Sequence, residues 1–388
     1  MVLGSGPDGT GGKLEDSRKL RVGIIGCGVG LLHLQGFAEI PRVEVVAIAG
    51  LDTERCQSLA AQFAVPRVYR DYQDLVADPD IEAVTVAVPN VLHFPVALAA
   101  LEAGKHVMVE KPLAPTSEEG EKIIAAARRA DRVLGVVFNR RGRQDVQLVK
   151  REVERGNLGE IYHARGFWMR RSGIPGLGSW FTSKQMAGGG PLIDLGVHVL
   201  DMALWVLGNP RARRVSAATY AKLGPRGRGQ WQGGRFKIAA GEPYEVEDFA
   251  TAFIRFDGGL TLQLDASWAA YTGHGDDFGL SILGDNGGAE IHARDYAQTE
   301  TLSFFGEIDG VPTVTQPRLL KRHDHGEVFK QFVESVLDGT PMSPSGEEGL
   351  DRVRLIEAIY RSAELGHEVE VDGAVSEQAH RAVLGVSE

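Results

Sequence analysis

The chain has 388 residues, of which 43% are hydrophobic and 24% charged, and its formal net charge is −10. This is the composition of an ordinary globular protein, and the length favours two domains. Nucleic-acid binding without sequence preference needs clustered Lys and Arg, which so acidic a chain does not favour. No apolar run reaches the roughly 18 residues needed to span a membrane. We therefore expect neither nucleic acid nor a membrane among its partners.

The two ends of the chain and its cysteines bear on location. Residues 1–19 are polar and rich in glycine, without the apolar segment of a signal peptide, and are predicted to be a disordered tail. Residues 371–388 are expected to form a second tail. Cys27 and Cys56 stand alone rather than in a CxxC pair, so neither a zinc site nor a disulfide is indicated. These features favour a reducing, cytoplasmic location.

The segment 20–140 alternates between short apolar runs and helical patterns. Strands are predicted at residues 20–27, 43–50, 81–89, 105–112 and 132–139, with a short one at the start of 67–78. Helices are predicted at residues 30–39, 53–63, 94–104 and 117–130, and in the rest of 67–78. Alternation at this spacing predicts βαβ units around a parallel sheet, and therefore an α/β domain over 20–140.

The segment 141–370 has a different character, with longer strands and fewer helices. Strand candidates lie at residues 159–171, 213–224, 247–269, 278–293 and 300–306. Asp257-Gly258-Gly259 separates two apolar runs and indicates a hairpin. Helices are predicted at residues 144–156, near 190–201, and at 325–338 and 347–366, and the Gly-, Arg- and Pro-rich residues 223–243 are predicted to be a loop. We expect a second domain with a mostly antiparallel sheet and helices on one face.

The stretch GIIGCGVGLLH, residues 23–33, follows a predicted strand and opens a predicted helix. In a dinucleotide-binding turn, Gly26 would allow the tight turn, and Gly28 would let the backbone approach a pyrophosphate. Val29 and Gly30 lead into the helix N-terminus, whose N–H groups and dipole favour anions. The alternative is a glycine-rich turn of the kind that joins any strand to a helix. The third glycine or alanine of the usual pattern falls on Leu31.

The end of the second strand commonly distinguishes NAD from NADP. An acid there accepts from the ribose 2′-hydroxyl, whereas an Arg nearby holds a 2′-phosphate. In this sequence Gly50 occupies the expected position of the acid, and Asp52 follows two residues later. Asp52 would either contact the ribose or cap the next helix. NAD or NADP is expected, with NAD favoured because no basic residue directly follows the strand.

The stretch GGGPLIDLGVHVLD, residues 188–201, predicts an apolar helix that carries Asp194, His198 and Asp201. Spacings of i, i+4 and i+7 place the three side chains on one face. Polar groups on a buried helix are costly unless paired. Either a core histidine is satisfied by a local acid, or this face lines a polar cavity in which Asp201 fixes the tautomer of His198.

These motifs together resemble the glucose–fructose oxidoreductase/inositol dehydrogenase (Gfo/Idh/MocA) family. The resemblance rests on GIIGCGVG, on VPNVLHFPVALAALEAGKHVMVEKPLA at residues 88–114, and on GGGPLIDLGVHVLD, and it covers about residues 20–370. It implies a Rossmann domain, a C-terminal domain with a large open sheet, a nicotinamide cofactor, a sugar or polyol substrate, and a homodimer or homotetramer. Leu31 and Gly50 depart from the common pattern.

The resemblance also implies roles for particular residues. Lys111, Asp194 and His198 match the family's catalytic lysine, acid and histidine. Pro89, Asn90 and His93 match the segment near the nicotinamide ribose, and the family pattern implies a cis peptide at Pro112. Glu110 is expected to pair with Lys111 or to contact the cofactor.

The residue types fit hydride chemistry. A base must reach the hydroxyl whose carbon loses hydride, and histidine suits this role near neutral pH. Lys111 follows a strand at the carboxyl end of the sheet, where ligands bind in open α/β folds, although a surface lysine is the alternative. Trp168 and Arg170 share one side of a predicted strand and, with Trp180, are expected to contact substrate. A packed Trp and a solvated Arg are the alternative.

The leading expectation is an NAD(P)-dependent dehydrogenase of a sugar, cyclitol or sugar derivative. One alternative is a glycosidase-type enzyme that keeps NAD bound and recycles it by transient oxidation. Another is a non-catalytic sensor of a nicotinamide nucleotide. No HExxH motif or run of His and Cys ligands is present, so no metal is expected.

Overall fold

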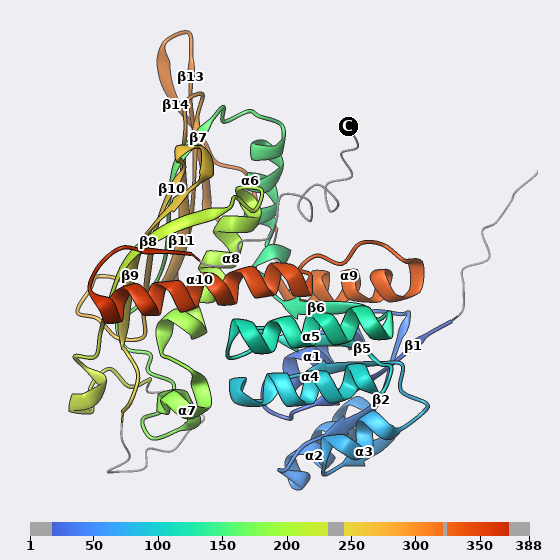
Figure 1. Cartoon of the computed structure of the whole chain (residues 1–388). Coiled ribbons are helices and arrows are strands. Elements are labelled where there is room, and N and C mark those ends of the chain that lie inside the picture. Colours follow the sequence, from blue (N-terminus) through green and yellow to red (C-terminus); the bar gives the residue numbers. More distant parts are fainter. Residues whose placement is uncertain (1–17, 232–243, 321–323, 372–388) are drawn as a thin grey trace, which may run out of the picture.

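The computed structural model describes residues 18–231, 244–320 and 324–371, whose strands form two sheets (Figure 1). Both predicted tails, apart from the residues next to the two sheets, lie outside the described residues, as does most of the predicted loop 223–243. Its first part includes a 3₁₀ turn at Gly224–Arg226.

The first sheet is parallel and has the strand order β3-β2-β1-β4-β5-β6. Its strands are β1 (Leu20–Ile25), β2 (Val43–Ala49), β3 (Arg67–Tyr69), β4 (Ala83–Val86), β5 (His106–Glu110) and β6 (Leu134–Val137). Its helices are α1 (Gly30–Ala38), α2 (Thr53–Phe63), α3 (Tyr72–Ala77), α4 (His93–Glu102) and α5 (Ser117–Ala130). This order is that of a Rossmann fold, and the direction of winding reverses between β1 and β4. The predicted parallel α/β arrangement is confirmed.

The second sheet has nine strands in the order β14-β13-β12-β11-β7-β10-β9-β8-β15. They are β7 (Ile161–Arg170), β8 (Ala212–Tyr220), β9 (Phe249–Phe256), β10 (Thr261–Ser267), β11 (Asp276–Gly284), β12 (Gly288–Ala293), β13 (Leu302–Ile308), β14 (Val311–Thr315) and β15 (Val369–Glu370). Only β7 and β10 pair in parallel. The hairpin predicted at Asp257-Gly258-Gly259 joins β9 to β10, whereas the edge strands β14 and β15 were not expected.

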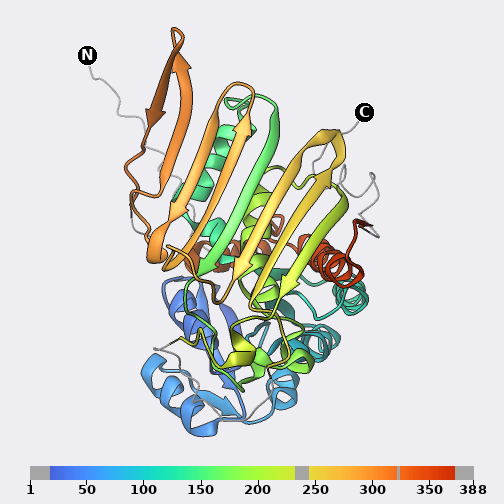
Figure 2. The same ribbon diagram turned by 90° about the vertical axis from the view of Figure 1, so that its left-hand side faces the viewer.

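Helices cover one face of this second sheet. They are α6 (Gln144–Glu154), α8 (Val197–Val206) and α10 (Gly346–Leu365). A Cβ on Gly166 would lie 2.6 Å from Val199 of α8, so the even-numbered residues of β7, including Trp168 and Arg170, face the helices. Figure 2 shows the other face, which no described helix crosses.

Helix α9 (Asp324–Asp338) differs from its expected place. The C-terminal helices were expected to cover the antiparallel sheet, but α9 packs on the Rossmann side. Phe329 stacks on Phe37 of α1 with ring centroids 4.7 Å apart. Phe329 and Phe332 are fully buried in one cluster with Leu20, which lies on β1. The apolar side of α9 is thus buried beside α1 and β1 of the Rossmann domain.

The segment Lys184–Val206 is long and apolar enough to cross a membrane by length and composition, although Asp194 and His198 interrupt its apolar residues. It comprises α7 (Lys184–Ala187), a π-helical turn at Leu192–Gly196 (η4) and α8. Of its most apolar 18 residues, 83% are buried inside the molecule. It is therefore a core helix that brings Asp194 and His198 between the two sheets.

Candidate active site

The loop from β1 to α1 has the geometry of a dinucleotide-binding turn. Gly26 has φ +107°, and a Cβ there would lie 2.1 Å from the carbonyl oxygen of Ala87. Only glycine fits such a position. A Cβ on Gly28, in contrast, meets no atom within 4 Å. Gly28 therefore leaves open space beside the N-terminus of α1, which begins at Gly30 after the exposed Val29. The loop fits a bound pyrophosphate.

The end of β2 is occupied by thiols rather than by an acid. A Cβ on Gly50 would lie 2.9 Å from the Sγ of Cys56 and 3.3 Å from that of Cys27. Burial raises the pKa of the Cys56 thiol to about 12, and its contact with Cys27 acts in the same direction. Both cysteines are free thiols, and they fill the space that a longer side chain at residue 50 would need.

Asp52 caps α2, which is one of the two roles expected for it. Its Oδ1 accepts the backbone N–H of Arg55 at 3.0 Å. The Nε of Arg55 donates to the carbonyl oxygen of Cys27 at 2.6 Å. The carboxylate of Asp52 thus lies next to the glycine loop.

A cleft of about 510 Å³, its open mouth included, lies where the carboxyl ends of the parallel strands meet the α7–α8 segment. The residues that line it are Val29, Ala87, Val88, Asn90, His93, Glu110, Lys111, Trp180, Phe181, Ala187, Gly189, Ile193 and Asp194. It brings together predicted residues from distant parts of the sequence, from the glycine loop to the π turn. A crevice at this edge is where open α/β sheets bind ligands.

Lys111 and Asp194 form an ion pair in this cleft. Lys111 Nζ lies 2.8 Å from Asp194 Oδ1 and also donates to the Asp194 carbonyl oxygen at 2.8 Å. Trp268 donates its Nε1–H to Asp194 Oδ2 at 2.9 Å. Burial acts to raise the pKa of Asp194, but the charges of Lys111 and Arg170 hold it below its usual value. The acid is therefore a carboxylate with both oxygens engaged.

His198 stands one turn further along the same helix and is neutral at neutral pH. Burial holds the pKa of His198 well below its usual value, and the nearby charges of Lys111 and Arg140 act in the same direction. Its buried Nδ1 has no hydrogen-bond partner among the described residues. A neutral imidazole can accept a proton near neutral pH, which suits His198 to acid–base chemistry.

The proposed role of Asp201 in fixing the tautomer of His198 is wrong. Although residues three apart on an α-helix differ in direction by only about 60°, Asp201 points to two arginines rather than to His198. Arg141 Nε donates to Asp201 Oδ2 at 2.8 Å, and Arg352 Nε donates to Oδ1 at 3.0 Å. Asp201 is fully buried there and neutralises cations from η2 (Asn139–Gly142) and α10.

Glu110 contacts histidine rather than the lysine side chain. Its Oε1 lies 2.9 Å from Nε2 of the buried His33, and its Oε2 accepts the backbone N–H of Lys111 at 3.2 Å. The peptide between Lys111 and Pro112 is cis, as the family pattern implied. Glu110 thus fixes the backbone from which Lys111 projects.

The segment after β4 supports the cleft wall mainly through its backbone. Pro89 precedes the short turn η1 (Asn90–Leu92), and Asn90 donates to the carbonyl oxygen of Ala187 at 2.8 Å. His93 lies 2.6 Å from the carbonyl oxygen of Pro112 and 3.0 Å from that of Val88 through its two ring nitrogens. His93 therefore holds the cleft walls together and offers neither nitrogen to a ligand.

The three predicted substrate residues have different surroundings. Trp180 lines the cleft and stacks on Phe181, with ring centroids 3.8 Å apart. Trp168 is buried and donates to Asp276 at 2.7 Å, with its ring centroid 5.8 Å from that of His198. Arg170 pairs with Asp276 at 2.8 Å and donates to the hydroxyl of Tyr296 at 2.6 Å. Trp168 and Arg170 thus form a wall behind His198.

Sequence reasoning missed several members of the site. Trp268 directly follows β10, and Asp276 is the first residue of β11. Arg140 lies over the rings of Trp168 and Phe278 at 4.9 and 4.8 Å, and its charge acts on His198. The only signal available for Arg140 was its position just after β6, at the edge where ligands bind. Trp268 and Asp276 come from separate strands, and no local motif marks them.

One cleft brings together Val29 of a Rossmann glycine loop, Lys111 and Asp194, and the neutral His198 lies one helical turn beyond Asp194. These features define a nicotinamide-dependent oxidoreductase. The N-terminal model of the Gfo/Idh/MocA oxidoreductases, described as an NAD-binding Rossmann fold, matches residues 20–138, and the C-terminal domain model matches residues 146–290. The chain belongs to this family.

Curated relatives and solved structures agree with this assignment. D-glucoside 3-dehydrogenase of Escherichia coli K12 is 34% identical, with 92% of this chain and 98% of the relative covered. Levoglucosan dehydrogenase of Pseudarthrobacter phenanthrenivorans is 30% identical, with 89% and 96% covered. A structure of levoglucosan dehydrogenase with NADH and levoglucosan has a TM-score of 0.82 at 27% identity, with 92% of this chain and 100% of that chain covered.

Proposed function

We propose that this oxidoreductase oxidises a secondary hydroxyl on the ring of a glucoside or an anhydrosugar, with Lys111, Asp194 and His198 as its catalytic residues. The observation that carries the proposal is the 2.8 Å ion pair between Lys111, which follows β5, and Asp194, whose helical segment also carries a neutral His198. Two relatives that match nearly the whole chain are named for such substrates. Nicotinamide, when bound, supplies the hydride acceptor.

The glycine loop would hold the pyrophosphate, with Gly28 leaving room for it and the N-terminus of α1 aimed at it. Asp52 would accept from the adenosine ribose, which favours NAD over NADP. The cleft walls at Val88, Asn90 and Glu110 would enclose the nicotinamide half. These residues fit a dinucleotide that lies along the carboxyl ends of the strands.

The proton chemistry follows from the neutral imidazole of His198 and the positive charge of Lys111. Neutral His198 takes the hydroxyl proton of the sugar as the carbon–hydrogen bond breaks. The ammonium of Lys111 donates to the same oxygen and stabilises the negative charge that develops on it. Asp194, held by Trp268, keeps Lys111 in place, and Trp180 offers an aromatic surface to the sugar ring. The same steps in reverse reduce a ketosugar.

The test is a substrate screen on purified protein with NAD⁺ and with NADP⁺. We expect reduction of the nucleotide with methyl glucosides or levoglucosan, and a keto-sugar whose oxidised carbon is identified by NMR. His198→Ala should lower kcat by about 10²-fold or more while dinucleotide affinity stays unchanged. Release of the aglycone without net NADH formation would instead favour the glycosidase-type alternative. Tight dinucleotide binding without turnover on any sugar would favour the sensor.

A cytoplasmic location and a homodimer or homotetramer remain predictions. The uncovered face of the nine-stranded sheet (Figure 2) supports self-association, since no described helix of the chain lies across it. Light scattering of the purified protein checks the oligomeric state.

A further inference from the structure

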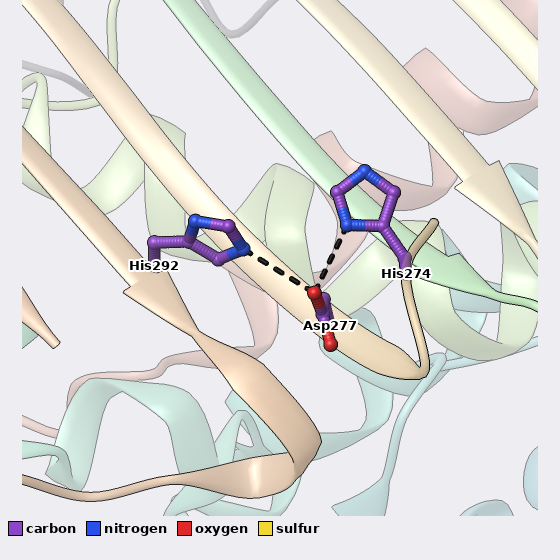
Figure 3. A group of neighbouring side chains, drawn as sticks. All are labelled: His274, Asp277 and His292. Atoms are coloured by element: carbon purple, nitrogen blue, oxygen red, sulfur yellow. Dashed lines mark hydrogen bonds and ion pairs between the residues drawn. The ribbon is translucent and has the colours of Figure 1, made fainter. Parts of the chain in front are cut away.

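Two histidines and an aspartate meet on the uncovered face of the second sheet, away from the cleft (Figure 3). Asp277 Oδ2 lies 2.9 Å from His274 Nδ1 and 3.4 Å from His292 Nε2. One ligand atom from each residue can be chosen so that all three lie within 4.8 Å of one another. His274 precedes β11, Asp277 is on β11 and His292 is on β12, so three separate points of the chain converge.

The register of the sheet explains why these side chains share a face. His292 of β12 is opposite Gly279 of β11, and Gly279 is opposite Phe167 of β7. Asp277 lies two residues before Gly279 and therefore points to the same side. The ring of Phe167 packs against both imidazoles, with centroids 5.5 Å from His274 and 5.4 Å from His292. A Cβ at Gly279 would lie 2.7 Å from the Phe167 ring, so glycine is needed beneath the cluster.

We propose that His274, Asp277 and His292 bind a divalent transition-metal ion, zinc by preference. Two imidazole nitrogens and one carboxylate oxygen are a common ligand set for zinc. Ligands at 2.0–2.1 Å from a tetrahedral ion are separated by roughly 3.3 Å, close to the two distances seen here. His274 and His292 remain about one third and one quarter exposed on their side chains, at 34% and 26%. A fourth position is thus open to water.

The carboxylate is held for this role, as a metal ligand's carboxylate usually is. Its other oxygen, Asp277 Oδ1, accepts the backbone N–H of Asp295 at 3.3 Å. Asp277 is only 5% exposed. The buried carboxyl group thus faces two partly exposed imidazoles, and its second oxygen is fixed by the backbone.

The ion would act on the catalytic cleft from the opposite side of the sheet. Asp276, the neighbour of Asp277 in the chain, points through to the helix-covered face, where it accepts from Trp168 and Arg170 at 2.7 and 2.8 Å. Asp295 also accepts the backbone N–H of Asp276, at 3.1 Å. A metal that ties His274 and His292 to β11 therefore fixes the strand end that positions Arg170 behind His198.

The first test measures binding without any sugar, so its outcome is independent of the proposed function. Tag-free protein, dialysed against chelator and then titrated with Zn²⁺ by calorimetry, should bind one ion at this site. His274→Ala and His292→Ala should each weaken that binding by at least roughly 100-fold, because loss of a ligand costs more than loss of a ligand's supporting partner. The matched control is His163→Ala, which removes a histidine of β7 on the same face that instead contacts Thr261.

Zinc binding by wild type and by His163→Ala, and its loss in both cluster variants, is the expected result. Equal zinc affinity in all four proteins would overturn the proposal, and so would absence of zinc binding by the folded wild-type protein. Circular dichroism establishes that each variant is folded. Substitution with Co²⁺ gives a second readout, since visible bands of four-coordinate intensity should appear in wild type and be lost in His292→Ala.

Discussion

A 2.8 Å ion pair joins Lys111, which directly follows β5 of the first sheet, to Asp194, which lies in the π turn before α8. The pair places a positive charge beside His198, whose pKa is held well below its usual value first by burial and then by Lys111 and Arg140. The lysine thus serves the site in two ways, through its hydrogen bonds and through its field.

The pH profile of oxidation should report this field. A base acts only when it is deprotonated, so kcat/KM rises with pH through the pKa of His198. In the wild-type enzyme that rise should be complete below pH 6.5, because the pKa of His198 lies well below its usual value of 6.5. Lys111→Met removes a charge that disfavours the imidazolium, so the rise should move to higher pH and kcat should fall. An unchanged profile in Lys111→Met would show that Lys111 does not act on His198.

Substitution of two glycines in the same loop should affect different properties, cofactor affinity at Gly28 and stability at Gly26. Gly28→Val meets open space in the protein, so the variant should keep its thermal midpoint and lose most of its affinity for NADH, measured by fluorescence titration. Gly26→Val forces a side chain into the carbonyl of Ala87 at a positive φ, so it should lower stability. Normal NADH affinity in Gly28→Val would contradict the proposal that the pyrophosphate binds at this loop.

The buried charge cluster behind the site should dominate stability. Asp201 accepts from Arg141 and Arg352, and all three side chains are almost fully buried. Asp201→Asn leaves two buried guanidinium groups without their shared counter-charge, which typically costs about 3–5 kcal/mol. Urea unfolding measures this loss. Ordinary substitutions lower the free energy of unfolding by roughly 1 kcal/mol. A loss no larger than that in Asp201→Asn would contradict this prediction.

Acid should weaken the same cluster. Burial opposes the shift, but Arg141 and Arg352 lower the pKa of Glu348 to about 2 from its usual 4.5. A carboxylate with a lowered folded-state pKa contributes stability that is fully present above pH 4.5 and is lost as the pH falls towards 2. Glu348→Gln should flatten the dependence of unfolding free energy on pH in that window. The measurement is the slope of unfolding free energy against pH between pH 5 and pH 3 in both proteins. Equal slopes would contradict the prediction.

The sequence sufficed to predict the features that local patterns encode. Each of these features lies within one short segment: the glycine loop, the lysine after β5 and the Asp194–His198 spacing. The strands and helices of the first sheet are likewise marked by their own local hydrophobic patterns. Asp201 was misplaced because its partners, Arg141 and Arg352, come from two distant segments whose convergence no spacing reveals. Trp268, Asp276 and the His274–Asp277–His292 cluster escaped notice for the same reason. The packing of separate strands brings these side chains together.

The position of α9 has a consequence for how this protein is made. Phe329 and Phe332 complete the hydrophobic layer over Leu20, which lies on β1 at the opposite end of the chain. A ribosome releases the whole first sheet and then most of the second before α9 exists. Until residue 338 has emerged, an apolar patch on the nascent sheet faces water, and such patches invite aggregation. The nascent chain therefore passes through a long interval in which a chaperone has a surface to bind.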